Sequence, residues 1–510
     1  MSKRVLLALI LIQLTLALMV ELRPFALAPP GHTYNILTTN FFYPALIRIA
    51  KDGSWCTFDM HTTRPVPCIN ANYFFIFWGK IAGLLSLHPV TMYQIARLTG
   101  GIAVFVLSYL FIKRNVPTRW QPWAVLFVLG AEVGLGATES QVTYLRHFGL
   151  PHHTWAEAIG IAFLIALLTA LQTKRLTYLL LACILGFIVT SILPSYPFTL
   201  IVSVFVPLGV WAVISPKRRF MIARIAAVVV AIAVAALLMK SEFSRGQPWN
   251  TFDVEKTWWK NREIIVQYSS SLILYTPFIL LFLVLTPVRW KHWETNQKML
   301  AIMASGWVFL PFIYIPLSSF SWFPIANGRL VDGYQFLPAG IMAVLGLRAL
   351  SESLPRLFFW IRILIGGTIA VSALFSLIFL TRIFAKQNIP WRNIYPTTGA
   401  WQSIQFTQTL PKNSGLMVHT YMGEIIPAFA SVRVFLGGPH GFSDWQERRT
   451  LTEEFYSGQM KQPKEFLIKN DVSFVYYGVD ERELNKTGSL YPELLDAIFE
   501  NPDVTIYRRR

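Results

Sequence analysis

Beyond Glu21, two carboxylates, Asp52 and Asp59, lie in a long polar segment that runs from residue 21 to about residue 73 of an otherwise apolar chain. Asp59 comes just before His61-Thr-Thr-Arg64, and a carboxylate in such a segment can act as a general base toward a hydroxyl. Asp52 belongs to Lys-Asp-Gly-Ser, a sequence typical of turns in which Asp bonds its own backbone. We therefore predict a catalytic role for Asp59 first and for Asp52 second. Arg64 could equally be a structural ion-pair partner of Asp59.

Cationic side chains at predicted helix starts form a second group of candidates. His152 and His153 open a predicted helix, whose N-terminus attracts anions such as phosphate; anchoring at the membrane interface is the alternative role for both. Arg329 precedes another, and its guanidinium suits forked recognition of a phosphate; the alternative is snorkelling to headgroups, with Asp332 as its neighbour. For Arg97, inside a predicted span, snorkelling is favoured over contact with the same phosphate. Adjacent His side chains diverge, so we assign no metal ligand.

The composition indicates that membrane helices position these residues. The chain has 510 residues, of which 54% are hydrophobic and only 14% are charged, against about 25% charged in a soluble domain. These values predict a polytopic membrane protein. The net charge of +18 is explained largely by basic cytoplasmic loops. Because no nucleic-acid-binding motif is present, we expect no nucleic-acid partner.

A helix needs roughly 20 apolar residues to cross a bilayer. On that basis we predict an all-α transmembrane bundle of about eleven helices. The first is a retained helix rather than a cleaved signal peptide. The predicted spans are 4–20, 92–112, 121–138, 156–173, 177–193, 198–214, 220–239, 268–287, 299–319, 336–350 and 358–381.

Basic residues next to the helix ends predict the orientation of the bundle. Pairs such as Lys113-Arg114 and Lys174-Arg175 mark cytoplasmic connections if the N-terminus is cytoplasmic. The first loop, 21–91, and the tail then lie outside the cytoplasmic (inner) membrane. In that compartment a disulfide between Cys56 and Cys68 is chemically allowed. Two free thiols are the equal alternative, and Cys183 is interpreted as a small core residue.

The tail differs in composition from the bundle. Short buried strands are predicted at 416–419, 432–436, 472–477 and 504–507, with helices at 444–456 and 464–470 between them. Strands alternating with helices predict a small α/β domain. We therefore divide the chain into a transmembrane domain, 1–384, and a C-terminal extracytoplasmic α/β domain, 385–510. No Gly-rich phosphate fingerprint follows a strand, so no nucleotide is expected there.

Together these features resemble the GT-C superfamily of polytopic membrane glycosyltransferases, in particular bacterial members with a C-terminal outer domain. The resemblance lies in the order of several short motifs rather than in any one of them. They are Tyr43, Asp52-Gly-Ser-Trp55, Asp59-Met-His-Thr-Thr-Arg-Pro65, Pro151-His152, Gly328-Arg-Leu-Val-Asp-Gly-Tyr334, Leu410–Val418, Gly423–Pro427, Val432–Gly437 and Tyr476-Tyr-Gly478.

The resemblance implies transfer of a sugar, hexosyl or pentosyl, from a polyprenyl-phosphate donor. The implied acceptor is a glycan, lipid or protein outside the cytoplasmic membrane, in biosynthesis of the cell envelope. By analogy a first-loop acid is the base, and Arg329 and His152 lie near the donor phosphate. A leaving lipid phosphate needs such cationic stabilisation. No cofactor is firmly implied, and a divalent metal remains open.

One departure from the family pattern bears on catalysis. Enzymes similar to this chain carry an acid just before the aromatic pair that precedes Tyr43, whereas this chain has Asn40. An amide cannot act as a base at neutral pH. Either Asp59 or Asp52 serves instead, or the chain is a catalytically silent relative that binds lipid-linked glycans or scaffolds a complex. A transporter is a third hypothesis, against which stands the lack of paired broken helices or an internal repeat.

Overall fold

The structure is a computed structural model that describes residues 42–129, 150–246, 260–273, 275–318, 320, 336–361, 363, 396–438, 444–485 and 490–510. These residues belong to two compact units. The helical unit contains the described parts of Arg97–Met239 and Phe252–Gln387. The loop–sheet unit contains those of Leu22–Ala96, Lys240–Thr251 and Asn388–Arg510. The described part of the first loop therefore folds with the tail.

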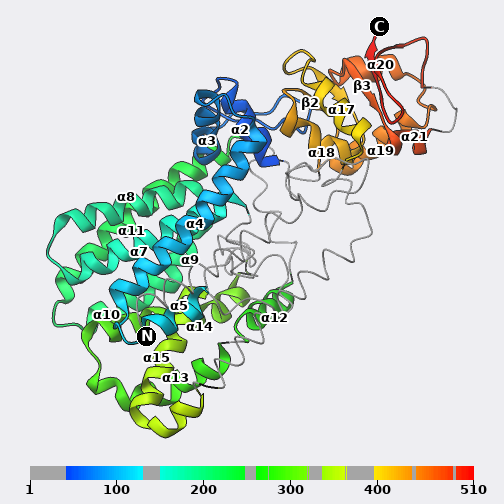
Figure 1. The fold of residues 1–510 in the computed structure, drawn as a ribbon. Helices are drawn as coiled ribbons and strands as arrows, with labels where there is room; N and C mark the ends of the chain where they lie inside the picture. Colours follow the sequence, from blue (N-terminus) through cyan, green and yellow to red (C-terminus); the bar gives the residue numbers. More distant parts are fainter. Residues whose placement is uncertain are drawn as a thin grey trace. The chain divides into compact units, whose positions relative to one another are not determined.

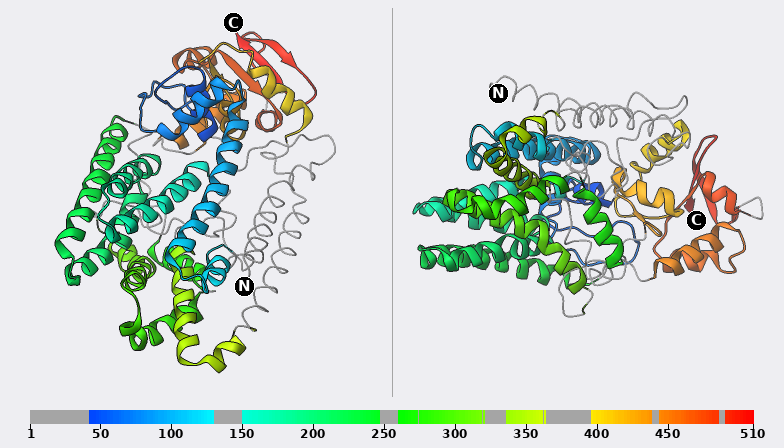
Figure 2. Two further views of the ribbon diagram at one scale, coloured as in Figure 1. Left: turned by 60° about the vertical axis from the view of Figure 1, so that its left-hand side comes forward. Right: turned by 90° about the horizontal axis from the view of Figure 1, so that it is seen from below.

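The helical unit consists of packed apolar helices, with α7, α8 and α11 running side by side (Figures 1 and 2). Within the described residues, α4, α7, α11, α14 and α15 are long and apolar enough to cross a membrane. In chain order the elements that carry the predicted spans are α4 (Pro89–Asn115), α5 (Gln121–Leu129), α7 (Pro151–Gln172), α8 (Leu176–Ile192), α9 (Tyr196–Leu200), the π-helix η1 (Ile201–Phe205), α10 (Val206–Ile214), α11 (Arg218–Phe243), α12 (Asn261–Ser271), α13 (Thr276–Arg289), the 3-10 helix η3 (Trp290–His292), α14 (Thr295–Leu317) and α15 (Phe336–Ser353).

Most of the predicted spans coincide with one helix each, and two do not. The predicted span 198–214 is divided among α9, η1 and α10. The predicted span 268–287 crosses from α12 into α13, and proline occupies the first turn of α13, where a missing N–H is tolerated. The span 4–20, most of 358–381 and the end of 121–138 lie outside the described residues, so the count of eleven stays a prediction.

Helix α7 lies in the core of the helical unit, with Phe163, Leu164 and Leu167 fully buried. Its C-terminal carbonyls, which have no partner within the helix, are bound by a side chain of α11. Arg224 donates from Nη1 to Ala170 O at 2.6 Å and from Nη2 to Lys174 O at 2.9 Å. The positive charge also suits the negative end of the helix. These bonds hold α7 at the end opposite to His152.

Other helices of this unit expose apolar side chains. Ile184 on α8 is 56% exposed, and Val230 and Leu237 on α11 are 61% and 67% exposed. A helix that presents apolar residues outward is stable when hydrocarbon, not water, covers that face. The pattern fits a multi-pass membrane protein.

The loop–sheet unit contains a five-stranded sheet of order β2-β1-β3-β5-β4. Strands β2, β1 and β3 are parallel, and β5 is antiparallel to both β3 and β4. The strands are β1 (Gly415–Met417), β2 (Arg433–Val434), β3 (Phe474–Tyr477), β4 (Leu495–Glu500) and β5 (Thr505–Arg509). The four predicted strands are present. Strand β4 was missed because it is an edge strand with little burial and lacks a continuous apolar run.

Five helices accompany this sheet, in the yellow to red part of the chain in Figure 1. They are α17 (Thr398–Thr407), α18 (Thr420–Phe429), α19 (Trp445–Tyr456), α20 (Pro463–Lys469) and α21 (Val479–Leu484). Helices α19 and α20 match the predicted 444–456 and 464–470. Their core includes Phe435, Phe455 and Val475, all buried. The predicted small α/β domain is therefore present.

Two helices not predicted from the sequence fold in the first loop, α2 (Phe42–Lys51) and α3 (Tyr73–Leu84). They pack closely because Gly79 of α3 has no side chain: a Cβ there would lie 2.5 Å from Ala50 Cβ. Tyr43 supports the same packing, with its ring stacked on Phe75 at 4.9 Å between centroids.

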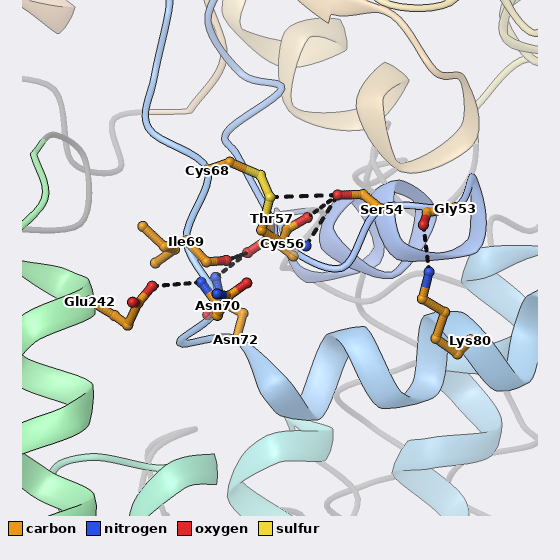
Figure 3. The surroundings of a disulfide bond; sticks show 10 residues. All are labelled: Gly53, Ser54, Cys56, Thr57, Cys68, Ile69, Asn70, Asn72, Lys80 and Glu242. Atoms are coloured by element: carbon orange, nitrogen blue, oxygen red, sulfur yellow. Dashed lines mark hydrogen bonds between the residues drawn. A yellow bond between two sulfur atoms is a disulfide. The ribbon is translucent and has the colours of Figure 1, made fainter.

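The chain between α2 and α3 is closed by a disulfide between Cys56 and Cys68, with Cα atoms 5.4 Å apart (Figure 3). The neighbouring residues pair as an antiparallel bridge, because Thr57 N donates to Ile69 O at 2.8 Å and Ile69 N donates back at 2.9 Å. Asn70 N also donates to Glu242 Oε2 at 2.9 Å. The segment that carries Asp59 is thus tied at both ends.

Candidate functional site

Asp59 is 1% exposed, and its two carboxylate oxygens have different surroundings. Oδ1 accepts hydrogen bonds from His61 N at 2.8 Å and from His61 Nδ1 at 3.0 Å. Oδ2 is buried, and no polar atom in the described part of the chain hydrogen-bonds it. A buried carboxylate oxygen without a partner is costly. Oδ2 is therefore the atom at which this side chain could accept a proton.

His61 orients Asp59 and is itself fixed on both sides. Its Nε2 lies 3.3 Å from the main-chain oxygen of Glu424, so both ring nitrogens face oxygen acceptors. Each ring nitrogen therefore has an oxygen to which it can donate when it carries a hydrogen. The ring also packs on Phe42, with centroids 5.5 Å apart. This arrangement holds the Asp59 carboxylate against the His61 imidazole in a buried setting.

The main chain around His61 runs beside strand β2 and the residues that follow it. Val434 N donates to Met60 O at 2.9 Å, and Gly437 N donates to His61 O at 3.2 Å. Gly437 permits this approach, since a Cβ there would lie 2.3 Å from His61 Cβ, closer than real Cβ contacts. The position of Asp59 thus depends on the C-terminal segment.

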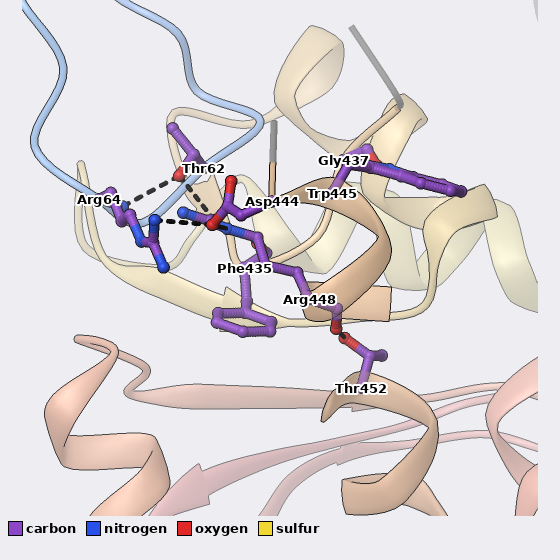
Figure 4. Close-up of polar contacts among 8 residues, drawn as sticks. All are labelled: Thr62, Arg64, Phe435, Gly437, Asp444, Trp445, Arg448 and Thr452. Atoms are coloured by element: carbon purple, nitrogen blue, oxygen red, sulfur yellow. Dashed lines mark hydrogen bonds and ion pairs between the residues drawn. The ribbon is translucent and has the colours of Figure 1, made fainter. Parts of the chain in front are cut away.

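The residues after His61 are held by a charged network, shown in Figure 4. Asp444 Oδ2 lies 2.6 Å from Arg64 Nη1 and 2.9 Å from Arg448 Nε. Arg448, which is 3% exposed, also donates to Thr62 Oγ1 at 2.8 Å. The expectation that Arg64 pairs with Asp59 is therefore wrong: Arg64 pairs with Asp444, and Asp59 pairs with His61.

Asp52 follows the last turn of α2, and both of its oxygens are used. Oδ2 accepts from Ser431 Oγ at 2.6 Å, and Oδ1 lies 3.5 Å from Lys412 Nζ. The predicted turn is present, with Gly53 at φ +114°, a backbone conformation that glycine adopts without strain. Instead of bonding its own backbone, the Asp52 side chain bonds the C-terminal segment. Its contacts favour a structural role.

A second, partly buried pair involves Arg48, one turn earlier on α2, and His88. Arg48 donates from Nη2 to Ala428 O at 3.2 Å and lies 2.9 Å from His88 Nε2. Burial, followed by the charges of Arg48 and Lys51, lowers the pKa of His88 to about 4. Burial lowers the pKa of Arg48 to about 10, against the opposing charge of Asp52. His88 is therefore neutral at physiological pH and accepts from Arg48.

In the helical unit, α7 begins at Pro151, as the sequence predicts, and the two histidines form its first turn. His152 and His153 are 6% and 8% exposed, with ring centroids 4.4 Å apart. Their rings contact each other instead of diverging. Arg97 is 7% exposed, whereas a snorkelling guanidinium would face outward. Asn40, Arg329 and Asp332 lie outside the described residues.

Parallel sheets often bind ligands beyond the strand ends where the strand order reverses, here between β1 and β3. In this unit the side chain of Glu481 fills that position. It accepts from His419 N at 2.9 Å and from Gly478 N at 2.9 Å. Burial raises the pKa of Glu481 to about 7. The two amides that an anion could use there are already satisfied.

Metal ligands were not assigned from the sequence. Within the described residues, no group of three or more His, Cys, Asp or Glu side chains is placed to hold a metal ion.

Sequence analysis missed the residues that hold Asp59. The sequence shows His61 only as a neighbour of Asp59, and no local pattern connects Gly437 or Arg448 with the first loop. The adjacency of His61 to Asp59 was a usable signal, because a residue two positions away can reach back to a carboxylate. Nothing local marks Gly437 or Arg448, whose contacts join positions far apart in sequence.

No family model matches the chain, and no curated protein matches it in sequence. Solved structures resemble it at low identity. ArnT from Cupriavidus metallidurans in the apo state is 12% identical with a TM-score of 0.54, over 98% of this chain and 97% of that one. The same protein bound to undecaprenyl phosphate is 14% identical with a TM-score of 0.53, over 98% of each chain.

Two further glycosyltransferases resemble the chain to a similar degree. The Archaeoglobus fulgidus oligosaccharyltransferase, tethered to an acceptor peptide, is 14% identical with a TM-score of 0.51, over 98% of this chain and 74% of that one. The arabinofuranosyltransferase AftD from Mycobacteria is 12% identical with a TM-score of 0.53, and 42% of its length is covered. This chain therefore shares its fold with these solved structures, in agreement with the fold that the resemblance to the GT-C superfamily implies.

Proposed function

We propose that this protein is an integral-membrane glycosyltransferase that transfers a sugar from a polyprenyl-phosphate-linked donor to an extracytoplasmic acceptor. The observation that carries the proposal is the likeness over 98% of each chain to ArnT bound to undecaprenyl phosphate. The oligosaccharyltransferase tethered to an acceptor peptide supports the presence of an acceptor in general. Fold alone does not fix function, so the chemistry rests on the residues.

In the proposed reaction the acceptor hydroxyl oxygen bonds to the anomeric carbon while the bond from that carbon to the phosphate oxygen breaks. The phosphate leaves with the electron pair, and the hydroxyl proton passes to Asp59 Oδ2. Base catalysis of this kind contributes about 10²–10⁴-fold. Arg329, Arg97, His152 and His153 are the proposed cationic and donor groups for the phosphate, and an N-terminal helix turn suits an anion.

The proposed location is the cytoplasmic membrane, with the N-terminus inside and the loop–sheet unit outside. The Cys56–Cys68 disulfide supports an outer loop–sheet unit, because disulfides persist in oxidising compartments. The basic helix ends on the opposite connections support the same orientation.

The test is turnover by purified protein in nanodiscs of polyprenyl-phosphate sugars, measured as release of polyprenyl phosphate. Sugar transfer with an added acceptor supports the proposal. Binding of the donor without release would contradict it and favour a silent relative that binds lipid-linked glycans. Asn40, in place of an acid, is the observation that favours this second function.

A further inference from the structure

A small cavity lies where several helices of the helical unit begin or end. Its volume is about 10 Å³, and its lining comes from the end of α4, the turn before α5, the start of α14 and the second half of α15. Helices α5 and α14 both pack against α15 (Figure 1). The polar side chains of the lining are Asn115, Trp120, Gln297 and Arg348, and the rest of the lining is apolar. A cavity of this volume admits one group of the size of a water oxygen.

Arg348 lines this cavity and has a buried N–H group to offer. Its Nε donates to Glu352 Oε1 at 2.8 Å, one turn later on α15. Its Nη1 is buried, and no atom of the described residues accepts a hydrogen bond from it. A buried donor of a charged group is costly to leave unpaired. Arg348 Nη1 is therefore suited to an acceptor that the described part of the chain does not supply.

Gln297 brings a second donor to the same cavity. It is 6% exposed and belongs to the first turn of α14, where its Oε1 accepts from Glu294 N at 3.3 Å. That bond uses the oxygen of the amide, so Nε2 is the atom left to donate to a ligand. The N-terminal turn of a helix also favours negative charge. Two donors, one of them cationic, favour an anionic oxygen as the occupant.

The position of the cavity along the helices indicates which anion can reach it. Helices α4, α14 and α15 are long and apolar enough to cross a membrane. The cavity contacts the last residue of α4 and the first turn of α14, which is where such helices leave the hydrocarbon. Lys113, Arg114 and Arg119, next to the lining residues of this connection, are exposed. Basic pockets between membrane helices at this level attract phospholipid headgroups.

From these observations we infer that the cavity is a binding site for an anionic phospholipid, one phosphate oxygen of which accepts hydrogen bonds from Arg348 Nη1 and Gln297 Nε2. The cavity holds one oxygen, and the rest of the headgroup stays at its mouth beside the exposed basic residues. Free phosphate is a poorer fit, because most of the lining is apolar.

This lipid site is separate from the groups proposed for sugar transfer. It lies at the end of α4 that is opposite to the first loop, and α4 has 27 residues. At about 1.5 Å per residue the two ends of α4 are about 40 Å apart. The inference stands whether or not the protein transfers sugars.

The experiment measures lipid binding to the delipidated full chain in dodecyl maltoside. Phosphatidylglycerol, a galactosyl diacylglycerol with the same acyl chains and inorganic phosphate are added in turn. Native mass spectrometry gives the affinity for each lipid, and thermal unfolding gives the stabilisation by each of the three probes. The variants are Arg348→Gln and Gln297→Glu, the second of which keeps an oxygen for Glu294 N but has no amide donor. The matched control is Arg356→Gln, which removes the same charge from an exposed arginine beyond the end of α15.

We expect the parent protein to bind phosphatidylglycerol more tightly than the galactolipid. Arg348→Gln and Gln297→Glu should weaken the binding of phosphatidylglycerol about fivefold or more, and Arg356→Gln should weaken it less than about twofold. If Arg348→Gln does not fold, Gln297→Glu decides the test.

Three results would overturn the inference. Equal affinity of the two lipids for the parent protein would mean that the acyl chains alone are bound. Equal weakening by Arg348→Gln and Arg356→Gln, with Gln297→Glu unchanged, would mean that the lipid responds only to net charge. Stabilisation by inorganic phosphate as large as that by phosphatidylglycerol would assign the cavity to a soluble phosphate instead.

Discussion

Asp52 and Asp59 stand seven residues apart in the same loop, yet their surroundings differ in kind. Both oxygens of Asp52 are occupied by side chains, Ser431 Oγ and Lys412 Nζ, and its side chain is 29% exposed. Asp59 is 1% exposed and uses one oxygen, through His61. A carboxylate with both oxygens satisfied holds structure together. Asp59 Oδ2, in contrast, is an acceptor that no polar atom of the described residues hydrogen-bonds.

The same contrast extends to the groups beside each acid. Near Asp52, the buried Arg48 donates to a neutral His88 and to the carbonyl oxygen of Ala428. Near Asp59, His61 is held between a carboxylate and a main-chain oxygen. The contacts of Arg48 anchor α2 to the C-terminal segment. The contacts of His61 fix the direction of the Asp59 carboxylate.

The largest expected effect is on turnover by Asp59→Asn. Asparagine keeps an oxygen for the His61 contacts but cannot take a proton, so we expect transfer to fall by about 10²–10⁴-fold. Donor binding is expected to be unchanged. Single-turnover kinetics of the two variants Asp59→Asn and Asp52→Asn check the contrast. If the Asp52 variant loses transfer and the Asp59 variant keeps it, the assignment of the two acids is reversed.

The next largest effect is expected from His61→Gln. Glutamine can bond Asp59 or Glu424 O but not both, so the carboxylate loses its fixed direction; misplacement of this size costs up to about 10²-fold. Because His61 is a positioning residue, kcat should fall with little change in KM, and the pH profile of kcat should shift. If His61→Gln lowers stability but leaves the pH profile of kcat unaltered per folded molecule, then the role of His61 is purely structural.

The fold was largely predictable because its apolar patterns are long. Spans such as 156–173 and 299–319 are continuous apolar runs, and they coincide with α7 and α14. Helices α2 and α3 were not predicted, because the sequence of the first loop is broken by turn residues and by the cysteine-closed segment. The division of 268–287 into two helices follows from a proline that apolar counting ignores.

The site was less predictable because its contacts are long-range. Asp59 was identified from its residue type and setting, but the contacts of Arg448 with Thr62 and of Gly437 with His61 join the first loop to the tail. Such contacts are determined by tertiary packing, which local sequence patterns do not predict. The ion pair of Arg64 with Asp59, one of the alternatives considered, is replaced by a pair with Asp444, which is distant in sequence and could not be predicted for the same reason.

Gly437→Ala should test whether the C-terminal segment holds Asp59 in place. The added methyl would meet His61 Cβ at 2.3 Å, so the loop must shift, at a cost of about 1–3 kcal/mol in unfolding free energy. The matched control is Gly438→Ala, whose new atom has as its three nearest neighbours atoms of the movable Glu424 side chain, the nearest, Oε1, at 2.8 Å. Thermal unfolding in detergent measures both. Equal stability of the two variants would contradict the predicted close packing.

Low pH should destabilise the contacts near Asp52, which include the Arg48–His88 pair. The pKa of His88 is lowered to about 4 from an ordinary value of 6.5, so the unfolded chain takes up the proton first as the pH falls. The contribution of His88 to the free energy of unfolding is complete above pH 6.5 and is lost as the pH falls toward 4. After allowance for partial exposure, this contribution is on the order of 1–2 kcal/mol. Thermal unfolding across this range should show a smaller loss in His88→Gln, which cannot titrate. An identical slope would mean that other groups cause the loss.

The smallest effect is expected from Asp52→Asn on stability. Its pair with Lys412 is 3.5 Å long and the lysine is 68% exposed, and exposed pairs contribute about 0–1 kcal/mol. Asparagine keeps an oxygen for Ser431, so unfolding should shift by less than about 1 kcal/mol and transfer should stay close to that of the parent. Lys412→Gln is the matched control, because it breaks the same pair from the other side. If Asp52→Asn lowers the free energy of unfolding by well over this amount and Lys412→Gln leaves it unchanged, then the Ser431 contact or the charge of Asp52 itself matters. The division between an anchoring and a reacting acid would then no longer hold.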